Sequence, residues 1–333
     1  MSPRALVRAR RGVLAACQAL PRKQRSAAYG RAIQIRDALY ADFRPEARPE
    51  NGLAGLLEVE LSRIDFEILL ALLYAKGHDA AHDFVHMVTE NMMFINGGET
   101  TIGVPAGTGF FSREEPERRI AVAPFWIDMD PVTNARFLTL FPGHVSDAAS
   151  PGANHPVTSV TWYAAAKYAA ALGKRLPTSV EWEHAARGIH GELYGDAIAN
   201  DAGRVQIWPS QGTIDVHHAA ISRRGLRGML GNVWEWTFPA AVVEMQGAHV
   251  VLAEARGGSW RHSKEGTRAT NFFALDAALR ADHVGFRAAF SLRTQDANAI
   301  LAPPGEAAMP RSMPIGQSLQ VALKAFVRRV ESP

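Results

Sequence analysis

The sequence contains almost no cysteine. Cys17 is the single cysteine among 333 residues, so the chain forms no intrachain disulfide and has no Cys-x-x-Cys motif. Cysteine usage therefore gives no sign of an oxidising compartment, and we expect a cytoplasmic protein. A site that needs two thiolates from this chain is excluded.

Long apolar runs are also missing. No segment approaches the roughly 20 consecutive apolar residues that a transmembrane helix requires. The sequence also lacks a glycine-rich phosphate-binding loop and the nucleophile elbow of α/β-hydrolases. We therefore expect no membrane span. The absence of both motifs means that neither phosphate-loop chemistry nor α/β-hydrolase chemistry is indicated.

The net charge is small, but the positive charge is concentrated at the start of the chain. A net charge of +3 does not indicate nucleic-acid binding. Residues 1–50, however, contain eleven Lys and Arg against four Asp and Glu. These residues form either the solvated face of helices or basic N-terminal helices that dock a partner or self-associate.

Residues 1–91 have the composition and spacing of a small helical domain. Gly77 divides its clearest helix from a second one. Apolar residues recur along the first of these helices at i+3/i+4 spacing: Leu57, Leu61, Ile64, Ile68 and Leu72.

From residue 92 onward, glycine, aromatic residues and short β-rich runs replace the helical pattern. We predict a helix over residues 160–173, capped by Thr158 or Ser159 and ended by its last glycine. A shorter helix over residues 179–188 begins at a cap on Thr178 or on the serine that follows it. Few long regular elements are expected after this helix.

These patterns divide the chain into three parts. Residues 1–91 form the helical domain, and residues 92–296 form an α+β domain with little regular secondary structure. Residues 297–333 form a linker and a C-terminal amphipathic helix.

Six segments of the middle domain carry a family resemblance because they occur together and in order. The segments are FINGGETTIG (94–103), PFWIDMDPVTNARF (124–137), HPVTSVTWYAAAKYAAALGKRLPTSVEWEHAARG (155–188), GLRGMLGNVWEWT (225–237), RGGSW (256–260) and GFRAAF (285–290). Together they resemble the formylglycine-generating-enzyme, or sulfatase-modifying-factor, family. The resemblance implies a C-type-lectin-like fold.

The GNVWEW segment carries a candidate calcium site. In an extended strand, Glu235 points to the face opposite Trp234 and Trp236. There it either coordinates an ion or braces the turn. The resemblance implies a calcium site with Gly231, Val233 and Glu235 as candidate ligands, and oxygen ligands of this kind suit calcium.

The segment after RGGSW lacks the family's copper ligands. Formylglycine-generating members place two copper-binding cysteines there, and this sequence has His262 and Thr267 at those positions. Cu(I) prefers thiolates. The resemblance therefore implies a member without the formylglycine-generating activity.

We predict that this segment forms a ligand groove instead. The first functional hypothesis is a ligand-recognition or accessory module whose partner is an unknown small molecule or protein, with no nucleic acid expected. The candidate groove residues are Trp260, Arg261, His262, Thr267, Arg268 and Asn271.

An alternative is a non-haem iron, O2-dependent oxidoreductase, which a resemblance to the ergothioneine and ovothiol sulfoxide synthases implies. The run GHDAAHDFVHMVTE places His78, His82 and His86 on one helix face, where they are candidate iron ligands. The competing interpretation is a polar stripe on an amphipathic helix. His82 is also not followed by the x-Glu of the family's iron motif.

A second alternative is a variable binding protein of a diversity-generating retroelement. Those proteins share RGGSW and GFR and vary the segment between them. On this hypothesis, residues 261–283 form a diversified recognition surface, whose mixed polar and aromatic side chains suit binding.

Overall fold

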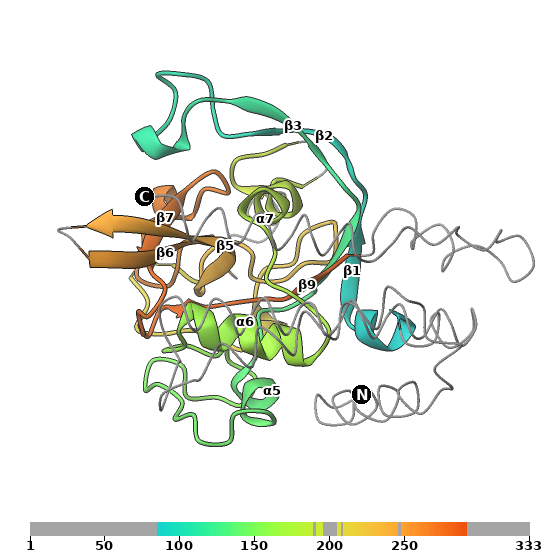
Figure 1. The fold of residues 1–333 in the computed structure, drawn as a ribbon, viewed down its shortest axis with the longest axis vertical. Coiled ribbons are helices and arrows are strands. Elements are labelled where there is room, and N and C mark those ends of the chain that lie inside the picture. The colour runs from blue at the N-terminus through green and yellow to red at the C-terminus, as the bar shows by residue number, and fades with distance from the viewer. Residues whose placement is uncertain (1–84, 189–190, 196–204, 208, 246–247, 292–333) are drawn as a thin grey trace, which may run out of the picture.

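The computed structural model describes most of the predicted middle domain (Figure 1). The described residues are 85–188, 191–195, 205–207, 209–245 and 248–291.

The predicted helical domain, except for its last residues, lies outside this part of the chain, as do the predicted linker and C-terminal helix. Residues 85–89 are helical, and Val85 and Val88 pack into the same core as Trp162. Among the described residues, no helix has the length and apolar character needed to cross a bilayer.

The domain contains two small antiparallel sheets. Strands β1 (Met92–Ile95), β4 (Phe125–Asp128) and β9 (Ala289–Phe290) pair antiparallel in the order β1-β4-β9. Strands β2 (Gly98–Ile102) and β3 (Arg118–Val122) form a separate antiparallel hairpin. Together with the loop that joins them, β2 and β3 make an arm that extends beyond α7 (Figure 1).

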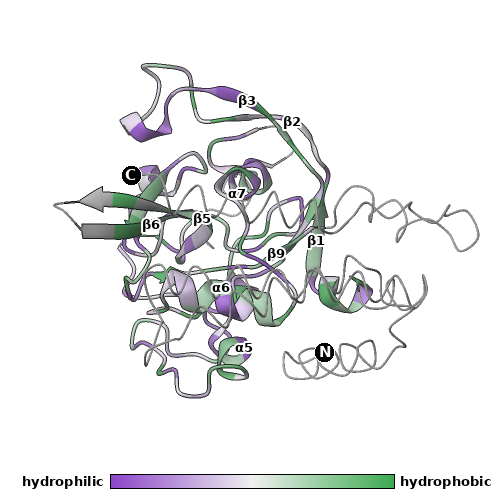
Figure 2. Ribbon diagram, viewed as in Figure 1, coloured by the Kyte–Doolittle hydropathy of each residue, from purple (hydrophilic) through white to green (hydrophobic). Residues whose placement is uncertain are grey.

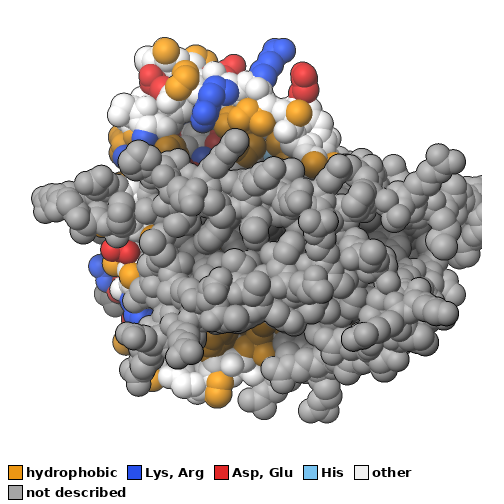
Figure 3. Space-filling model, viewed as in Figure 1, with side chains coloured by type: hydrophobic (Ala, Val, Ile, Leu, Met, Phe, Trp, Pro, Cys, Tyr) orange, Lys and Arg blue, Asp and Glu red, His pale blue; other side chains and the backbone are white. Residues whose placement is uncertain are grey.

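The surface of this arm mixes charged side chains of both signs with hydrophobic ones, as the upper part of Figure 3 shows. The short 3-10 helix η2 (Ser112–Glu114) lies in the loop between the two strands.

The largest sheet has the strand order β7-β6-β5-β8. Only β5 and β8 pair in parallel in this sheet. Its members are β7 (Phe272–Asp276), β6 (Ala248–Arg256), β5 (Trp234–Met245) and β8 (Val284–Gly285).

Few long regular elements follow residue 190 in the described part of the chain, as predicted, and the two long ones are β5 and β6. The two strands have 12 and 9 residues and pair as a hairpin. The register shifts between Trp236 and Ala240, which breaks the period-two alternation that identifies a strand in sequence.

Three α-helices and two further 3-10 turns complete the described part of the domain. They are α5 (Asn134–Leu138), α6 (Trp162–Ala171), α7 (Ser179–Ala186), η4 (Val216–His218) and η5 (Lys264–Thr267).

The caps of the two longer helices follow the predictions in part. Thr178 caps α7, where its hydroxyl accepts from the Glu181 N–H and the Glu181 carboxylate accepts from the Thr178 N–H. The predicted cap of α6 is wrong, because Thr161 accepts from the Ala164 N–H at 3.1 Å. Gly173 ends α6 as expected, with a φ of 75° that favours glycine.

Two hydrophobic clusters make up the core, and the start of β5 separates them. Trp234 and Trp236 belong to the cluster that surrounds Trp162 on α6. Glu235, between them, reaches Trp182 of the other cluster. The predicted alternation of this segment is therefore confirmed. Figure 2 shows hydrophobic and hydrophilic segments side by side on α6, as expected for a helix with one face in the core.

Candidate functional site

The RGGSW segment turns sharply where β6 ends. Gly257 and Gly258 have φ values of 100° and 72°, which favour glycine. A Cβ at Gly257 would lie 2.6 Å from the Met229 carbonyl oxygen, and one at Gly258 would lie 2.8 Å from Thr267 Cα. The glycine pair thus lets the chain pass close to η5 and brings Ser259 and the residues after it beside β5.

His262 is fixed by two hydrogen bonds to one ring nitrogen. Its Nδ1 lies 3.3 Å from the indole N–H of Trp234 and 2.8 Å from the hydroxyl of Ser259. Because an indole N–H only donates, Nδ1 accepts and the proton of the neutral ring is on Nε2. The Ser259 hydroxyl in turn accepts from the Arg261 N–H, which leaves its own hydrogen to donate to His262.

The surroundings of His262 keep the imidazole neutral. Burial is the main cause that lowers its pKa to about 4, and the nearby His283, Arg261 and Arg113 add to the effect. The ring packs edge-on against Trp234, with centroids 5.2 Å apart. At pH 7, therefore, His262 presents an Nε2–H donor and no positive charge.

Thr267, at the end of η5, has a structural hydrogen bond. Its side chain is fully buried, and its hydroxyl donates to the Lys264 carbonyl within η5. A Cβ at Gly266 would lie 2.9 Å from His262 Cβ, which shows how closely η5 folds back on the histidine. The two positions at which the resemblance implies thiolates therefore supply an imidazole and a hydroxyl that already donates within η5.

The other predicted groove residues divide into surface and buried groups. Arg261 is exposed, lies over the Trp260 ring and pairs with Asp282. Trp260 is buried, and its N–H donates to the Asp282 carbonyl at 3.5 Å. Arg268 and Asn271 are buried as well. Of the six residues, only Arg261 and His262 are exposed or partly exposed, and the other four support them.

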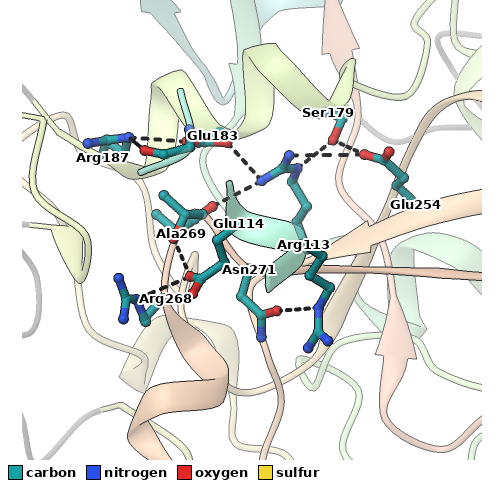
Figure 4. Close-up of polar contacts among 12 residues, drawn as sticks. Arg113, Glu114, Ser179, Glu183, Arg187, Glu254, Arg268, Ala269 and Asn271 are labelled. Carbon is teal, nitrogen blue, oxygen red and sulfur yellow. Dashed lines mark hydrogen bonds and ion pairs between the residues drawn. The ribbon is translucent and has the colours of Figure 1, made fainter. Parts of the chain in front are cut away.

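Arg268 and Asn271 contact the part of the arm that joins β2 to β3 (Figure 4). Glu114 lies 3.1 Å from Arg268 Nε as an ion pair. Arg113 Nε donates to the Asn271 side-chain oxygen at 2.9 Å. Arg113 also lies over the ring of Phe273, 4.0 Å from its centroid. Sequence reasoning missed Arg113 and Glu114, since no local pattern connects residues so distant in the chain.

A second buried ion-pair group joins α7 to the start of the RGGSW segment. Glu183 accepts from Arg256 at 3.0 Å and from Arg187 at 3.2 Å. Arg256 also donates to the Ala269 carbonyl and to Ser179, as Figure 4 shows. These contacts fix both ends of the loop that carries His262.

Both carboxylate oxygens of Glu235 have partners within the protein, and its role as a calcium ligand stays a prediction. Glu235 is fully buried, and its two carboxylate oxygens accept from Arg287 Nε and Nη2 at 2.7 and 2.8 Å. The Trp182 indole donates to the same carboxylate at 2.7 Å. A calcium ion at this carboxylate would lie next to a buried guanidinium, which favours the alternative interpretation that Glu235 braces the turn. Gly231, with φ 79°, and Val233 form the turn before it.

The candidate iron ligands fall mostly outside the described residues. His78 and His82 lie there, and His86 is exposed on the helical residues 85–89. Within the described part of the chain, no group of three His, Cys, Asp or Glu side chains is arranged to hold a metal ion.

A comparison with family models places the domain in a known family. The model of the sulfatase-modifying factor enzyme 1-like domain matches residues 79–292, which is more than half of the chain. The chain belongs to this family. The resemblance inferred from the six sequence segments is thereby confirmed, and so is a mixed α+β domain of this type.

Two known relatives of this chain are proteins of different kinds. The chain is 32% identical over 244 residues to the serine/threonine-protein kinase Pkn1 of Chlamydia trachomatis, covering 61% of this chain and 38% of that protein. It is 31% identical over 214 residues to a formylglycine-generating enzyme of Streptomyces coelicolor, covering 44% of this chain and 68% of that one. The chain thus spans well under half the length of Pkn1.

Among solved structures, PvdO from Pseudomonas aeruginosa has a similar fold. Its TM-score is 0.51 at 22% sequence identity, over 60% of this chain and 94% of that one. This likeness concerns the fold alone.

Proposed function

We propose that this chain is a formylglycine-generating-enzyme-like ligand-recognition or accessory module without the copper-dependent activity. The observation that carries the proposal is the hydrogen bonding of His262. Its Nδ1 accepts from Trp234 and Ser259, so the ring is set as a neutral Nε2–H donor. Cu(I) needs soft ligands, and neither this imidazole nor the buried Thr267 hydroxyl supplies a thiolate.

The same geometry suits recognition. His262, Phe273 and His283 are all partly exposed, and the His262 ring lies 6.5 Å from Phe273 and 6.1 Å from His283 between centroids. No hydrogen bond from His262 Nε2 is found to any described residue, which leaves that N–H able to donate to a ligand. The buried ion pairs beneath the loop hold it in one conformation, so binding needs little ordering.

The match to Pkn1 supports a modular role. It covers only part of that longer protein, as expected for a domain combined with others. The similarity to a formylglycine-generating enzyme does not extend the activity to this chain, because this sequence has His262 and Thr267 at the positions where the resemblance implies two cysteines.

Copper binding tests the proposal directly. We expect that the wild type neither takes Cu(I) from a competing chelator nor forms formylglycine in a cysteine-containing sulfatase peptide, as measured by mass spectrometry. The double variant His262→Cys, Thr267→Cys should gain Cu(I) binding, whereas Thr267→Cys alone should not. Formylglycine produced by the wild type would refute the proposal.

Recognition itself is tested by a thermal-shift screen of small molecules. A molecule that binds at this site should lose binding in His262→Ala and keep it in His217→Ala, because His217 is exposed on η4 and is not one of the predicted groove residues. If every molecule that binds the wild type also binds both variants equally well, recognition lies elsewhere on the chain.

A further inference from the structure

A cavity lies between α5 and α6, separate from the His262 loop. Its volume is about 420 Å³, within the range of about 300–1,000 Å³ that small-molecule sites occupy. Phe137 and Phe141, on α5 and directly after it, line one side, and Tyr163 and Ala164 of α6 line the other. None of the six predicted groove residues lines it.

The apolar wall of this cavity is well supported. Phe137 stacks on Phe141, with centroids 4.7 Å apart, and on Tyr168 at 5.4 Å. Behind them Phe286 packs edge-on against Phe137 at 6.1 Å. Phe137, Tyr168 and Phe286 belong to the buried core and Phe141 packs against it, so the wall is preformed and a ligand would not need to order it. Figure 3 shows hydrophobic side chains at the surface near α5, at the lower edge of the view.

The charges around the cavity have one sign. Lys167 and Arg280 line it, and no Asp or Glu does so among the described residues. Arg280 Nη1 donates to the Ser159 carbonyl at 3.2 Å, which holds the guanidinium beside the start of α6. The carboxylate of Asp147 accepts hydrogen bonds from the Ser159 hydroxyl and the Ala149 N–H.

His144 adds no charge to the lining. Burial is the main cause that lowers its pKa, and the nearby Arg280 lowers it further. The ring packs edge-on against Phe137, with centroids 5.1 Å apart. The cavity therefore combines aromatic walls, a neutral imidazole and two cationic side chains.

We propose that this cavity binds an apolar molecule that carries a single anionic group, such as a medium-chain or aromatic monocarboxylate. The apolar part lies between α5 and α6, against Phe137, Phe141 and Ala164. The carboxylate lies at the mouth and pairs with Arg280. A carboxylate and a guanidinium form charge-assisted hydrogen bonds, which are stronger than neutral ones. This site does not depend on the function proposed for the His262 loop.

Calorimetric titration of the full chain with octanoate tests this proposal, with octan-1-ol as the uncharged counterpart. We expect octanoate to bind and octan-1-ol to bind about tenfold more weakly, the effect of losing one charge-assisted hydrogen bond. Arg280→Gln should weaken octanoate binding by a similar factor. Arg118→Gln is the matched control, because Arg118 is exposed on β3, and it should leave binding unchanged.

Variants that fill the cavity provide a second test of the proposal. Ala164→Phe should abolish octanoate binding, since the new ring would occupy the space beside Phe141. If a melting curve shows that this variant is unfolded, Leu140→Trp fills the cavity from the loop after α5, where Leu140 is partly exposed.

Three results would overturn the proposal. They are no octanoate binding by the wild type at millimolar concentration, unchanged binding in a folded cavity-filling variant, and equal binding of octanoate and octan-1-ol. The last result would mean an apolar cavity with no preference for an anion.

Discussion

Glu114 and Arg268 form an ion pair that connects two distant parts of the chain. Glu114 lies on η2, in the loop between β2 and β3, and Arg268 directly follows η5. Both side chains are buried, and Glu114 also accepts from the Thr270 hydroxyl and the Phe111 N–H. The arm is thus fastened to the loop that carries His262, so its stability and the geometry of that loop depend on each other.

Removing the Glu114 charge should destabilise the protein strongly. In Glu114→Gln the buried Arg268 keeps its charge without a partner, a change that costs about 3–5 kcal/mol in buried pairs. The free energy of unfolding in urea measures this loss. Glu117→Gln is the control, because Glu117 is exposed, and it should change that free energy by less than about 0.5 kcal/mol. Equal effects of the two substitutions would show that the ion pair contributes little.

The lowered pKa of His262 predicts how the stability of the protein depends on pH. Its folded pKa of about 4 lies below the ordinary value of 6.5, so between these pH values the unfolded chain binds more protons at this residue. The contribution of His262 to stability is therefore complete above pH 6.5 and is lost as the pH falls toward 4.

Unfolding measured over this pH range tests the prediction. The wild type should lose more stability between pH 6.5 and 4 than His262→Gln does, and the difference isolates this residue from His144, His155 and His184, whose pKa values are also lowered. If the stabilities of the wild type and His262→Gln changed equally with pH, the prediction of a lowered pKa for His262 would be wrong. An NMR titration of the imidazole gives an independent value of its pKa.

Local signals in the sequence predicted much of the fold. The Thr178 cap and the alternation of Trp234, Glu235 and Trp236 depend on neighbouring residues, and both were found. The β5–β6 hairpin was missed because the register shift after Trp236 interrupts its alternation. For the cap of α6, three hydroxyl residues lie close together at positions 158, 159 and 161, so sequence alone did not identify Thr161.

The candidate site was predictable only where one segment supplies it. RGGSW and its glycines located the loop of His262. Four of the six predicted groove residues are buried, and their hydrogen-bond and ion-pair partners include residues of η2, of η5 and of the turn before β8. Contacts such as Arg113 with Asn271 join segments that have no common motif.

The pair formed by Glu235 and Arg287 makes a prediction about calcium. Both side chains are fully buried, so Glu235→Gln should cost about 3–5 kcal/mol whether or not calcium is present. The melting temperature of the wild type and of this variant, each measured in calcium and in EDTA, gives the comparison. A calcium-dependent rise in the wild type that disappears in Glu235→Gln would restore the predicted ligand role of this carboxylate.

Metal analysis decides between recognition and redox chemistry. The protein should be purified without chelators and without a histidine tag, and its metals measured by mass spectrometry. Because His86 is exposed and neither His262 nor Thr267 supplies a thiolate, we expect neither iron nor copper near one equivalent. Near-stoichiometric iron that is lost in His82→Ala would instead establish His78, His82 and His86 as ligands. O2 uptake with thiols and histidine derivatives would then be the next measurement, and the recognition proposal would fail.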